Sequence, residues 1–129
     1  MRKLGLLLLF LLTSTSALAK WAEVNGGGDR TNYVDPSTIR ASGSKTKMWG
    51  ITDFKTAQTL NDMRYLSLAH QQEYDCKEET NRLLANTYYT GNMGTGEVIY
   101  SDSDVGSKPA PIMPGTIGEV LFRTACDNK

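Results

Sequence analysis

The segment from Arg64 to Cys76 alternates between a more apolar and a more polar set of side chains. One set is Leu66, Leu68, His70, Gln72, Tyr74 and Cys76, and the other is Tyr65, Ser67, Ala69, Gln71, Glu73 and Asp75. A period of two with one more apolar face predicts a half-buried strand in an antiparallel sheet. This assignment of faces places Cys76 towards the interior, where a disulfide partner could meet it.

The first nineteen residues have the pattern of a secretory signal peptide. Arg2 and Lys3 give a positive start, residues 4–12 are mostly apolar, and Ala17-Leu18-Ala19 is a small-residue cleavage pattern. A helix of this apolar length rises only about 14 Å, whereas a bilayer core takes roughly 20 residues. We therefore expect residues 1–19 to be removed and the exported chain to begin at Lys20.

Lys20 is not the cysteine that carries a bacterial lipid anchor, so we expect no membrane anchor and a location in the periplasm or the medium, with surface display in doubt. Removal of the leader from the 129-residue chain leaves 110 residues, enough for one domain over 20–129. Without Arg2 and Lys3, 12 basic residues face 14 acidic ones. This balance predicts neither a nucleic-acid footprint nor a polybasic membrane patch.

Cys76 and Cys126 are the two cysteines of the chain. In an exported protein they most simply form one disulfide, with two free thiols or intermolecular pairing as the alternatives. The bond would close a loop of about 50 residues, which is worth roughly 4 kcal/mol in the chain-entropy model.

Short runs of extended pattern predict further strands at residues 20–24, 33–34, 47–54, 80–89 and 97–100. Helix competes with strand over residues 78–84. The stretches 42–45 and 102–111 are predicted loops, and the polar stretch 55–62 is a predicted connection.

The C-terminal segment has a helical rather than an extended pattern. Thr116 with Glu119 three residues later is a capping-box pattern, and apolar residues follow it at helical spacing. A helix from about Ile117 to Cys126 is expected. The residues thus predict an α+β fold, an antiparallel β-sheet with a C-terminal α-helix packed on it and one disulfide.

The sequence contains few patterns that are typical of catalytic, cofactor-binding or metal-binding sites. His70 is the only histidine, so it is best interpreted as a hydrogen-bonded structural residue rather than a zinc ligand or catalytic base. A strand, not a helix, is predicted after the glycines of 91–96, which favours a hairpin turn over a phosphate loop. Residues 102–106 lack the further ligands of a calcium loop. The sequence therefore predicts no catalytic, cofactor-binding or metal-binding residues.

Tyr88, Tyr89 and Met93 flank the predicted turn at 91–96. Aromatic side chains and methionine are enriched at protein interfaces. We expect these three residues to form a protein-binding site, with Met93 and Tyr89 as an apolar tip beside the sheet edge. A core role for part of the set is the alternative.

Several short segments, in order, resemble the surface-adhesin protein E family of small exported bacterial proteins. They are 33–40, Trp49, 53–55, 73–76, 93–96, 111–116 and 125–126. The resemblance covers Trp21 to Cys126, nearly all of the expected mature chain.

The resemblance implies an antiparallel sheet with a C-terminal helix packed on it, and a non-enzymatic role. The member that gives the family its name is displayed on the bacterial surface, binds host matrix and serum proteins and can dimerise. We therefore expect a protein-binding module, with a homodimer as a possibility. The alternative is a periplasmic inhibitor or accessory subunit that acts on another bacterial envelope protein.

Overall fold

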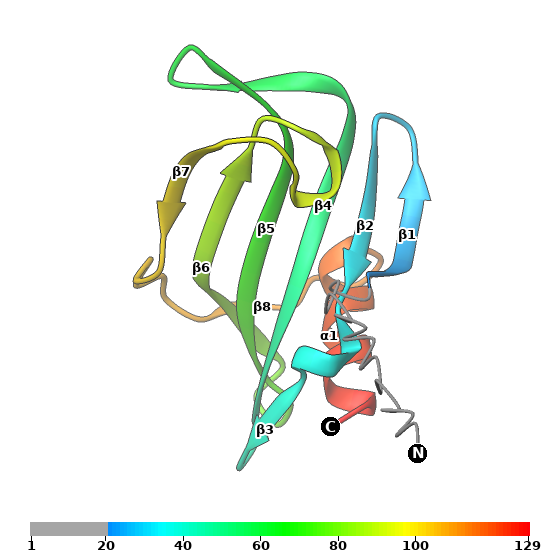
Figure 1. The fold of residues 1–129 in the computed structure, drawn as a ribbon. Coiled ribbons are helices and arrows are strands. Elements are labelled where there is room, and N and C mark those ends of the chain that lie inside the picture. Colours follow the sequence, from blue (N-terminus) through cyan, green and yellow to red (C-terminus); the bar gives the residue numbers. More distant parts are fainter. Residues whose placement is uncertain (1–20) are drawn as a thin grey trace, which may run out of the picture.

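One strongly bent antiparallel sheet packs on a single C-terminal helix (Figure 1). The computed structural model describes residues 21–129, so the expected leader and the cut before Lys20 lie outside it. The strands are Ala22–Gly27 (β1), Arg30–Val34 (β2), Arg40–Ser42 (β3), Lys45–Leu60 (β4), Met63–Asp75 (β5), Thr80–Tyr89 (β6), Val98–Asp102 (β7) and Ala110–Pro111 (β8). Two 3-10 turns are Pro36–Thr38 (η1) and Asn92–Gly94 (η2), and the helix is Ile117–Asp127 (α1).

The sheet order is β1-β2-β4-β5-β6-β7, with β3 paired to β4 and β8 paired to β6. Every pairing is antiparallel. The predicted combination of an antiparallel sheet and a C-terminal helix is confirmed, although the sheet dominates. β6 is a strand throughout, so the helical alternative for residues 78–84 is wrong.

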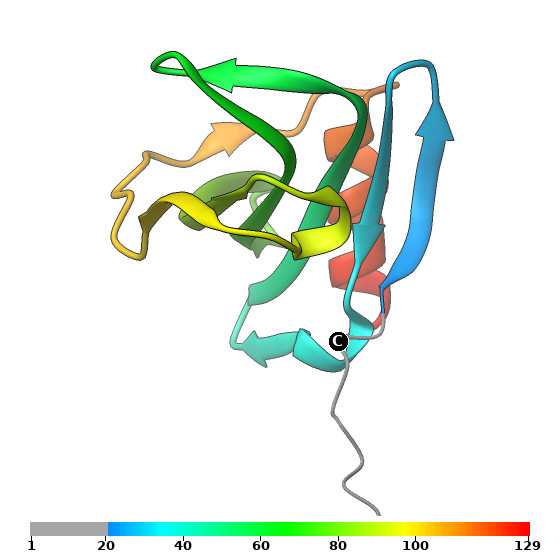
Figure 2. The same ribbon diagram turned by 45° about the horizontal axis from the view of Figure 1, so that its top comes forward.

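The alternation in β5 has the predicted faces. The register places Thr46 opposite Tyr74 and Gly50 opposite His70, and such cross-strand pairs share one face of the sheet. This face carries the core under α1, whose buried members are Val34, Met48, Tyr74, Leu121 and Ala125. Figure 2 shows α1 on one side of the sheet and the η2 loop crossing the other.

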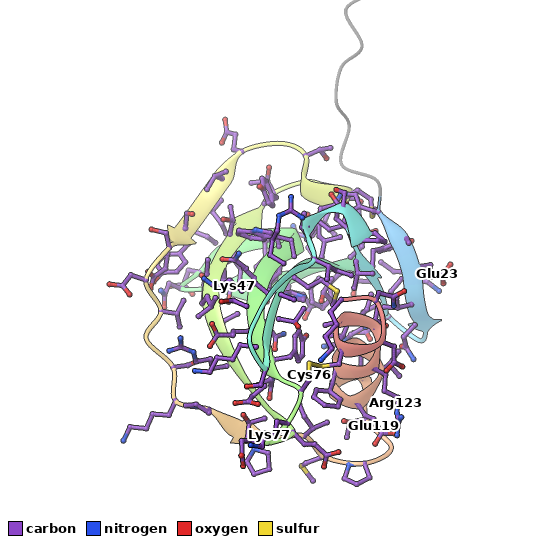
Figure 3. All side chains as sticks on the ribbon, turned by 90° about the horizontal axis from the view of Figure 1, so that it is seen from below. Glu23, Lys47, Cys76, Lys77, Glu119 and Arg123 are labelled. Atoms are coloured by element: carbon purple, nitrogen blue, oxygen red, sulfur yellow. A yellow bond between two sulfur atoms is a disulfide. The ribbon has the colours of Figure 1, made fainter. Side chains whose placement is uncertain are left out.

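A disulfide joins Cys76, just past the end of β5, to Cys126 in α1, as predicted (Figure 3). The two Cα atoms are 5.7 Å apart, within the ordinary range for a disulfide. α1 begins at the predicted residue, and the Thr116 side chain accepts a hydrogen bond from the backbone N–H of Glu119 at 3.3 Å. The Glu119 carboxylate turns towards Arg123, 4.0 Å away.

The predicted connection at 55–62 is wrong, because β4 continues to Leu60 and pairs with β5 as far as Met63. Only Asn61 and Asp62 form the turn, and both have positive φ, at 48° and 64°. Two consecutive residues of this kind are the signature of a tight hairpin turn. The polar composition of 55–60 instead reflects a largely exposed hairpin end, which begins at a register irregularity after Asp53.

Candidate protein-binding surface

Four aromatic side chains form a continuous series of ring contacts near the hairpin end of β4 and β5. The Tyr88 ring lies edge-on to Tyr65, with centroids 4.9 Å apart, and to Tyr100 at 5.9 Å. Tyr65 in turn meets Phe54 edge-on at 5.7 Å. We call Phe54, Tyr65, Tyr88 and Tyr100 the aromatic row. Contacts of this geometry contribute about 0.5–1.5 kcal/mol each beyond the burial of area, so they hold the rings in place.

The register explains why residues so far apart in sequence come together. Leu68 of β5 pairs with Tyr88 of β6, and Tyr88 pairs with Tyr100 of β7, so all three point to one side. At the inner end, the Arg30 guanidinium lies 5.1 Å from the centre of the Phe54 ring. Exposure grows along the row, from 5% for Phe54 to 45% for Tyr100. The row therefore runs from the interior to the surface at the edge of the sheet.

Burial raises the pKa of Tyr88, and the neighbouring phenols of Tyr65 and Tyr100 raise it further. Because the ordinary pKa of tyrosine already lies well above physiological pH, this shift leaves the Tyr88 hydroxyl protonated there. A neutral phenol both donates and accepts a hydrogen bond. The aromatic row can thus combine apolar contact with hydrogen bonding, which is the combination that makes tyrosine common at interfaces.

The row ends on an open sheet edge. Within residues 21–129, β7 pairs only with β6, so its outer edge has no strand beside it. Val98 is 54% exposed and Tyr100 45% exposed on this short strand. An exposed edge carries unpaired N–H and C=O groups that can hydrogen-bond to another chain.

The three residues predicted to bind protein do not lie on one face. Tyr88 belongs to the aromatic row, whereas Tyr89 pairs with Ser67 and Val98 and points to the opposite side. Met93 is half-buried and belongs to η2, whose Gly94 lies beside the Tyr89 ring. Their role in binding stays a prediction. Sequence reasoning missed Phe54 and Tyr65 as members of this surface.

The turn at 91–96 folds back over the sheet and forms no protruding tip. The Met93 N–H donates to Asp53 Oδ1 at 2.8 Å, and the Asn92 side chain donates to the same oxygen at 3.1 Å. The buried Ser67 hydroxyl donates to the Gly91 carbonyl at 2.7 Å and accepts from the Gly94 N–H at 2.9 Å. The loop is therefore held against β4 and β5.

Replacing Ser67 with alanine will loosen this loop, because the Gly91 carbonyl and the Gly94 N–H lose their hydrogen-bond partner. We expect Ser67→Ala to lower the free energy of unfolding by about 1–3 kcal/mol. Urea denaturation will measure this change, and amide hydrogen exchange at Gly94 will report the local loosening. Ser101→Ala, which removes an exposed hydroxyl, is the matched control. Unchanged exchange at Gly94 in the Ser67 variant would contradict this account of the loop.

His70 lies on the same side as the aromatic row, over Gly50. A Cβ at Gly50 would approach the His70 ring carbon Cε1 to 2.7 Å, so only glycine leaves room for the imidazole. Thr52 Oγ1 is 3.5 Å from Nε2, and burial lowers the pKa of His70 to about 4. His70 is thus a neutral, packed residue at neutral pH, consistent with the structural role expected for it.

Among residues 21–129, no three His, Cys, Asp or Glu side chains converge in a way that could hold a metal ion. No helix in this described range has the length and apolar character needed to span a membrane.

A family model described as surface-adhesin protein E matches residues 21–127. Solved structures of Haemophilus influenzae protein E have the same fold. One is 11% identical, with a TM-score of 0.63, and the match covers 88% of this chain and 89% of that chain. A second crystal form is 12% identical, with a TM-score of 0.60 and coverage of 75% and 80%. No curated protein sequence matches the chain.

Proposed function

Because this chain belongs to the surface-adhesin protein E family, we propose that it is an exported, non-enzymatic module that binds another protein through the aromatic row and the β7 edge. The observation that carries this proposal is the position of Tyr100. It is the exposed end of a packed series of rings and also lies on the open edge strand.

The edge and the ring series complement each other. An extended segment of a partner can add to β7 as a further strand, with main-chain hydrogen bonds supplying affinity. Side chains of such a strand alternate between the two faces of the sheet. On one face they would meet Tyr100, and on the other Val98, which pairs with Tyr89. Specificity would then come from aromatic contacts on the first face and apolar contacts on the second.

We propose that the partner is a host matrix or serum protein. A protein of the producer's own envelope is the second candidate, in which case the chain is a periplasmic inhibitor or accessory subunit. A second copy of the chain is the third, since two antiparallel β7 edges can pair with each other. All three partners would use the same edge, so one set of variants tests them.

We expect Tyr100→Ser to weaken binding about tenfold or more, because truncating a central aromatic at an interface commonly costs at least that much. The purified protein is used to capture partners from host serum and, separately, from an envelope extract of the producer, and self-association is measured by analytical ultracentrifugation. Met113→Ser is the matched control, since Met113 is 68% exposed and lies outside the row.

Capture from serum that Tyr100→Ser abolishes and Met113→Ser preserves would support the host-protein proposal. Capture from the envelope extract alone would favour the inhibitor or accessory subunit. Capture that both variants preserve would show that the aromatic row is not the binding surface.

A further inference from the structure

Four cationic side chains gather on the face of the sheet opposite α1. The register aligns Arg40 of β3 with Lys47 of β4, Lys47 with Glu73 of β5, and Glu73 with Arg82 of β6. Lys45 belongs to the same face, two residues before Lys47. We call Arg40, Lys45, Lys47 and Arg82 the basic row. Figure 3 shows Lys47 on the side of β4 away from the helix and Cys76.

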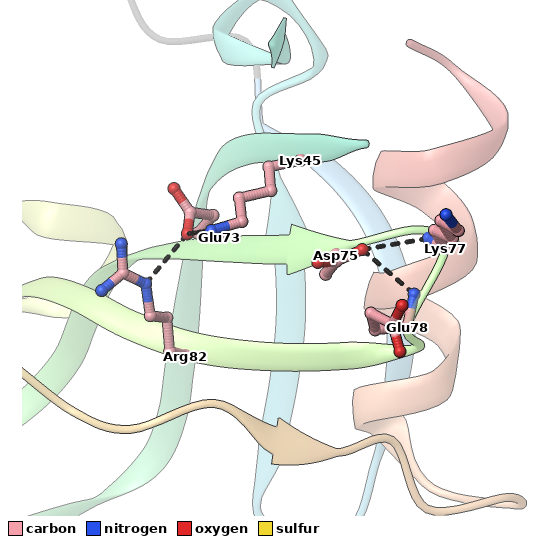
Figure 4. Close-up of polar contacts among 6 residues, drawn as sticks. All are labelled: Lys45, Glu73, Asp75, Lys77, Glu78 and Arg82. Carbon is pink, nitrogen blue, oxygen red and sulfur yellow. Dashed lines mark hydrogen bonds and ion pairs between the residues drawn. The ribbon is translucent and has the colours of Figure 1, made fainter. Parts of the chain in front are cut away.

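Carboxylates only partly neutralise this row. Glu73 lies between the cations, with its side chain 10% exposed, and its Oε1 accepts from Arg82 Nε at 2.9 Å and lies 3.9 Å from Lys45 Nζ (Figure 4). Asp75, beside Lys45, accepts from the backbone N–H groups of Lys77 and Glu78 at 3.1 and 3.0 Å. These backbone hydrogen bonds, first that from Glu78, lower the pKa of Asp75.

Four cations against two carboxylates leave a local excess of positive charge. Residues 21–129 together have the opposite balance, because they contain 11 basic and 14 acidic residues. Reversal of the prevailing charge on one face favours association with an anionic partner.

The cations remain available to such a partner. Arg40, Lys45 and Lys47 are exposed, and the Arg82 side chain is 37% exposed. Arg40 Nη1 donates to the carbonyls of Ser37 and Ile39 at 2.8 and 2.9 Å, which orients the guanidinium. In the described part of the chain, Lys47 has no ion-pair partner and Arg82 engages a protein acceptor only through Nε.

The spacing of the row matches an extended peptide. Neighbouring strands lie about 4.8 Å apart, so Arg40 and Arg82 are separated by three spacings, or roughly 14 Å. In an extended peptide, side chains on one face recur every two residues, about 6.7 Å, so positions i and i+4 are roughly 13 Å apart. Carboxylates at i, i+2 and i+4 would therefore meet Arg40, the pair of lysines, and Arg82.

We propose that the basic row binds an extended acidic segment of a protein, running across the strands with carboxylates at alternate positions. This site is separate from the aromatic row, on the other face of the sheet. It gives the module a second point of contact, which does not depend on the β7 edge.

Fluorescence anisotropy with a labelled peptide Ser-Glu-Thr-Glu-Thr-Glu-Ser tests the proposal. We expect binding that weakens as salt rises, because exposed charges are screened. Lys47→Glu should reduce affinity about tenfold or more, and Lys47→Gln about threefold. Lys55→Glu, the same charge change at an exposed position on the same strand, should leave affinity unchanged. Melting temperatures of all variants establish that they are folded.

Peptide binding should depend on the basic row and not on the aromatic row, so Tyr100→Ser should bind the peptide normally. Absence of peptide binding, or an equal loss in Lys55→Glu, would overturn the proposal. A heparin oligosaccharide serves as a second probe. Binding of heparin but not of the peptide, with dependence on Lys47, would also overturn it and assign the row to a sulfated glycan.

Discussion

Replacing Cys126 with serine will lower the free energy of unfolding by about 2–5 kcal/mol. The disulfide closes a loop with a sequence separation of 50, and its loss frees the unfolded chain of that constraint. It also ties down α1, which has 11 residues and would be marginal as an isolated helix. Leu121 and Ala125, both buried under the sheet, depend on that attachment.

Urea denaturation of the oxidised protein and of Cys126→Ser will give the two free energies of unfolding. The double variant Cys76→Ser, Cys126→Ser and the reduced wild-type protein are the controls, and both should lose a similar amount. Equal stability of oxidised and reduced wild type would show that packing alone holds α1 in place.

Acidification from neutral pH to about pH 4 will destabilise the protein by about 3 kcal/mol through His70 alone. Burial lowers the pKa of His70 in the folded state from 6.5 to about 4. The unfolded chain therefore binds the proton first as the pH falls. The contribution of this histidine is fully present above pH 6.5 and is lost progressively between pH 6.5 and about 4.

Free energies of unfolding across this pH range will test the prediction, with His70→Gln as the comparison. The variant cannot take up the proton, so its stability should fall less steeply over the same interval, whatever its stability at neutral pH. Asp75, whose pKa is lowered, loses its contribution at more acidic pH and is a separable effect. Identical slopes for wild type and His70→Gln would mean that the imidazole is solvated in the folded protein.

Local patterns predicted the parts of the fold that depend on neighbours in sequence. The alternation from Arg64 to Cys76 predicted β5 and the face that packs on α1, because side chains in a strand point alternately to the two sides. Thr116 and Glu119 predicted where α1 begins, because a helix start needs a side-chain partner for its free N–H groups. The two cysteines, one at the end of each of these elements, predicted the disulfide.

The hairpin end of β4 and β5 was predictable only from Asn61-Asp62, since the polar residues before it resemble a loop. The proportion of polar side chains in a strand depends on whether other parts of the protein cover it, and this hairpin end is largely exposed. The turn at 91–96 was likewise only partly predictable from its own residues. Its glycines predicted a turn, but the hydroxyl of Ser67 and the carboxylate of Asp53, distant in sequence, decided that it lies flat on the sheet.

The sequence alone thus determined the antiparallel sheet, the C-terminal helix, the disulfide and the family. Each of these follows from a short-range pattern or from the type of residue. The tertiary structure alone decided which side chains meet. Tyr88 and Tyr89 are adjacent, yet they face opposite ways, and Tyr88 joins Tyr65 and Tyr100. Register between strands makes these contacts, and register is set by the packing of the whole sheet. The basic row has the same origin, since its members come together only when β3, β4, β5 and β6 pair.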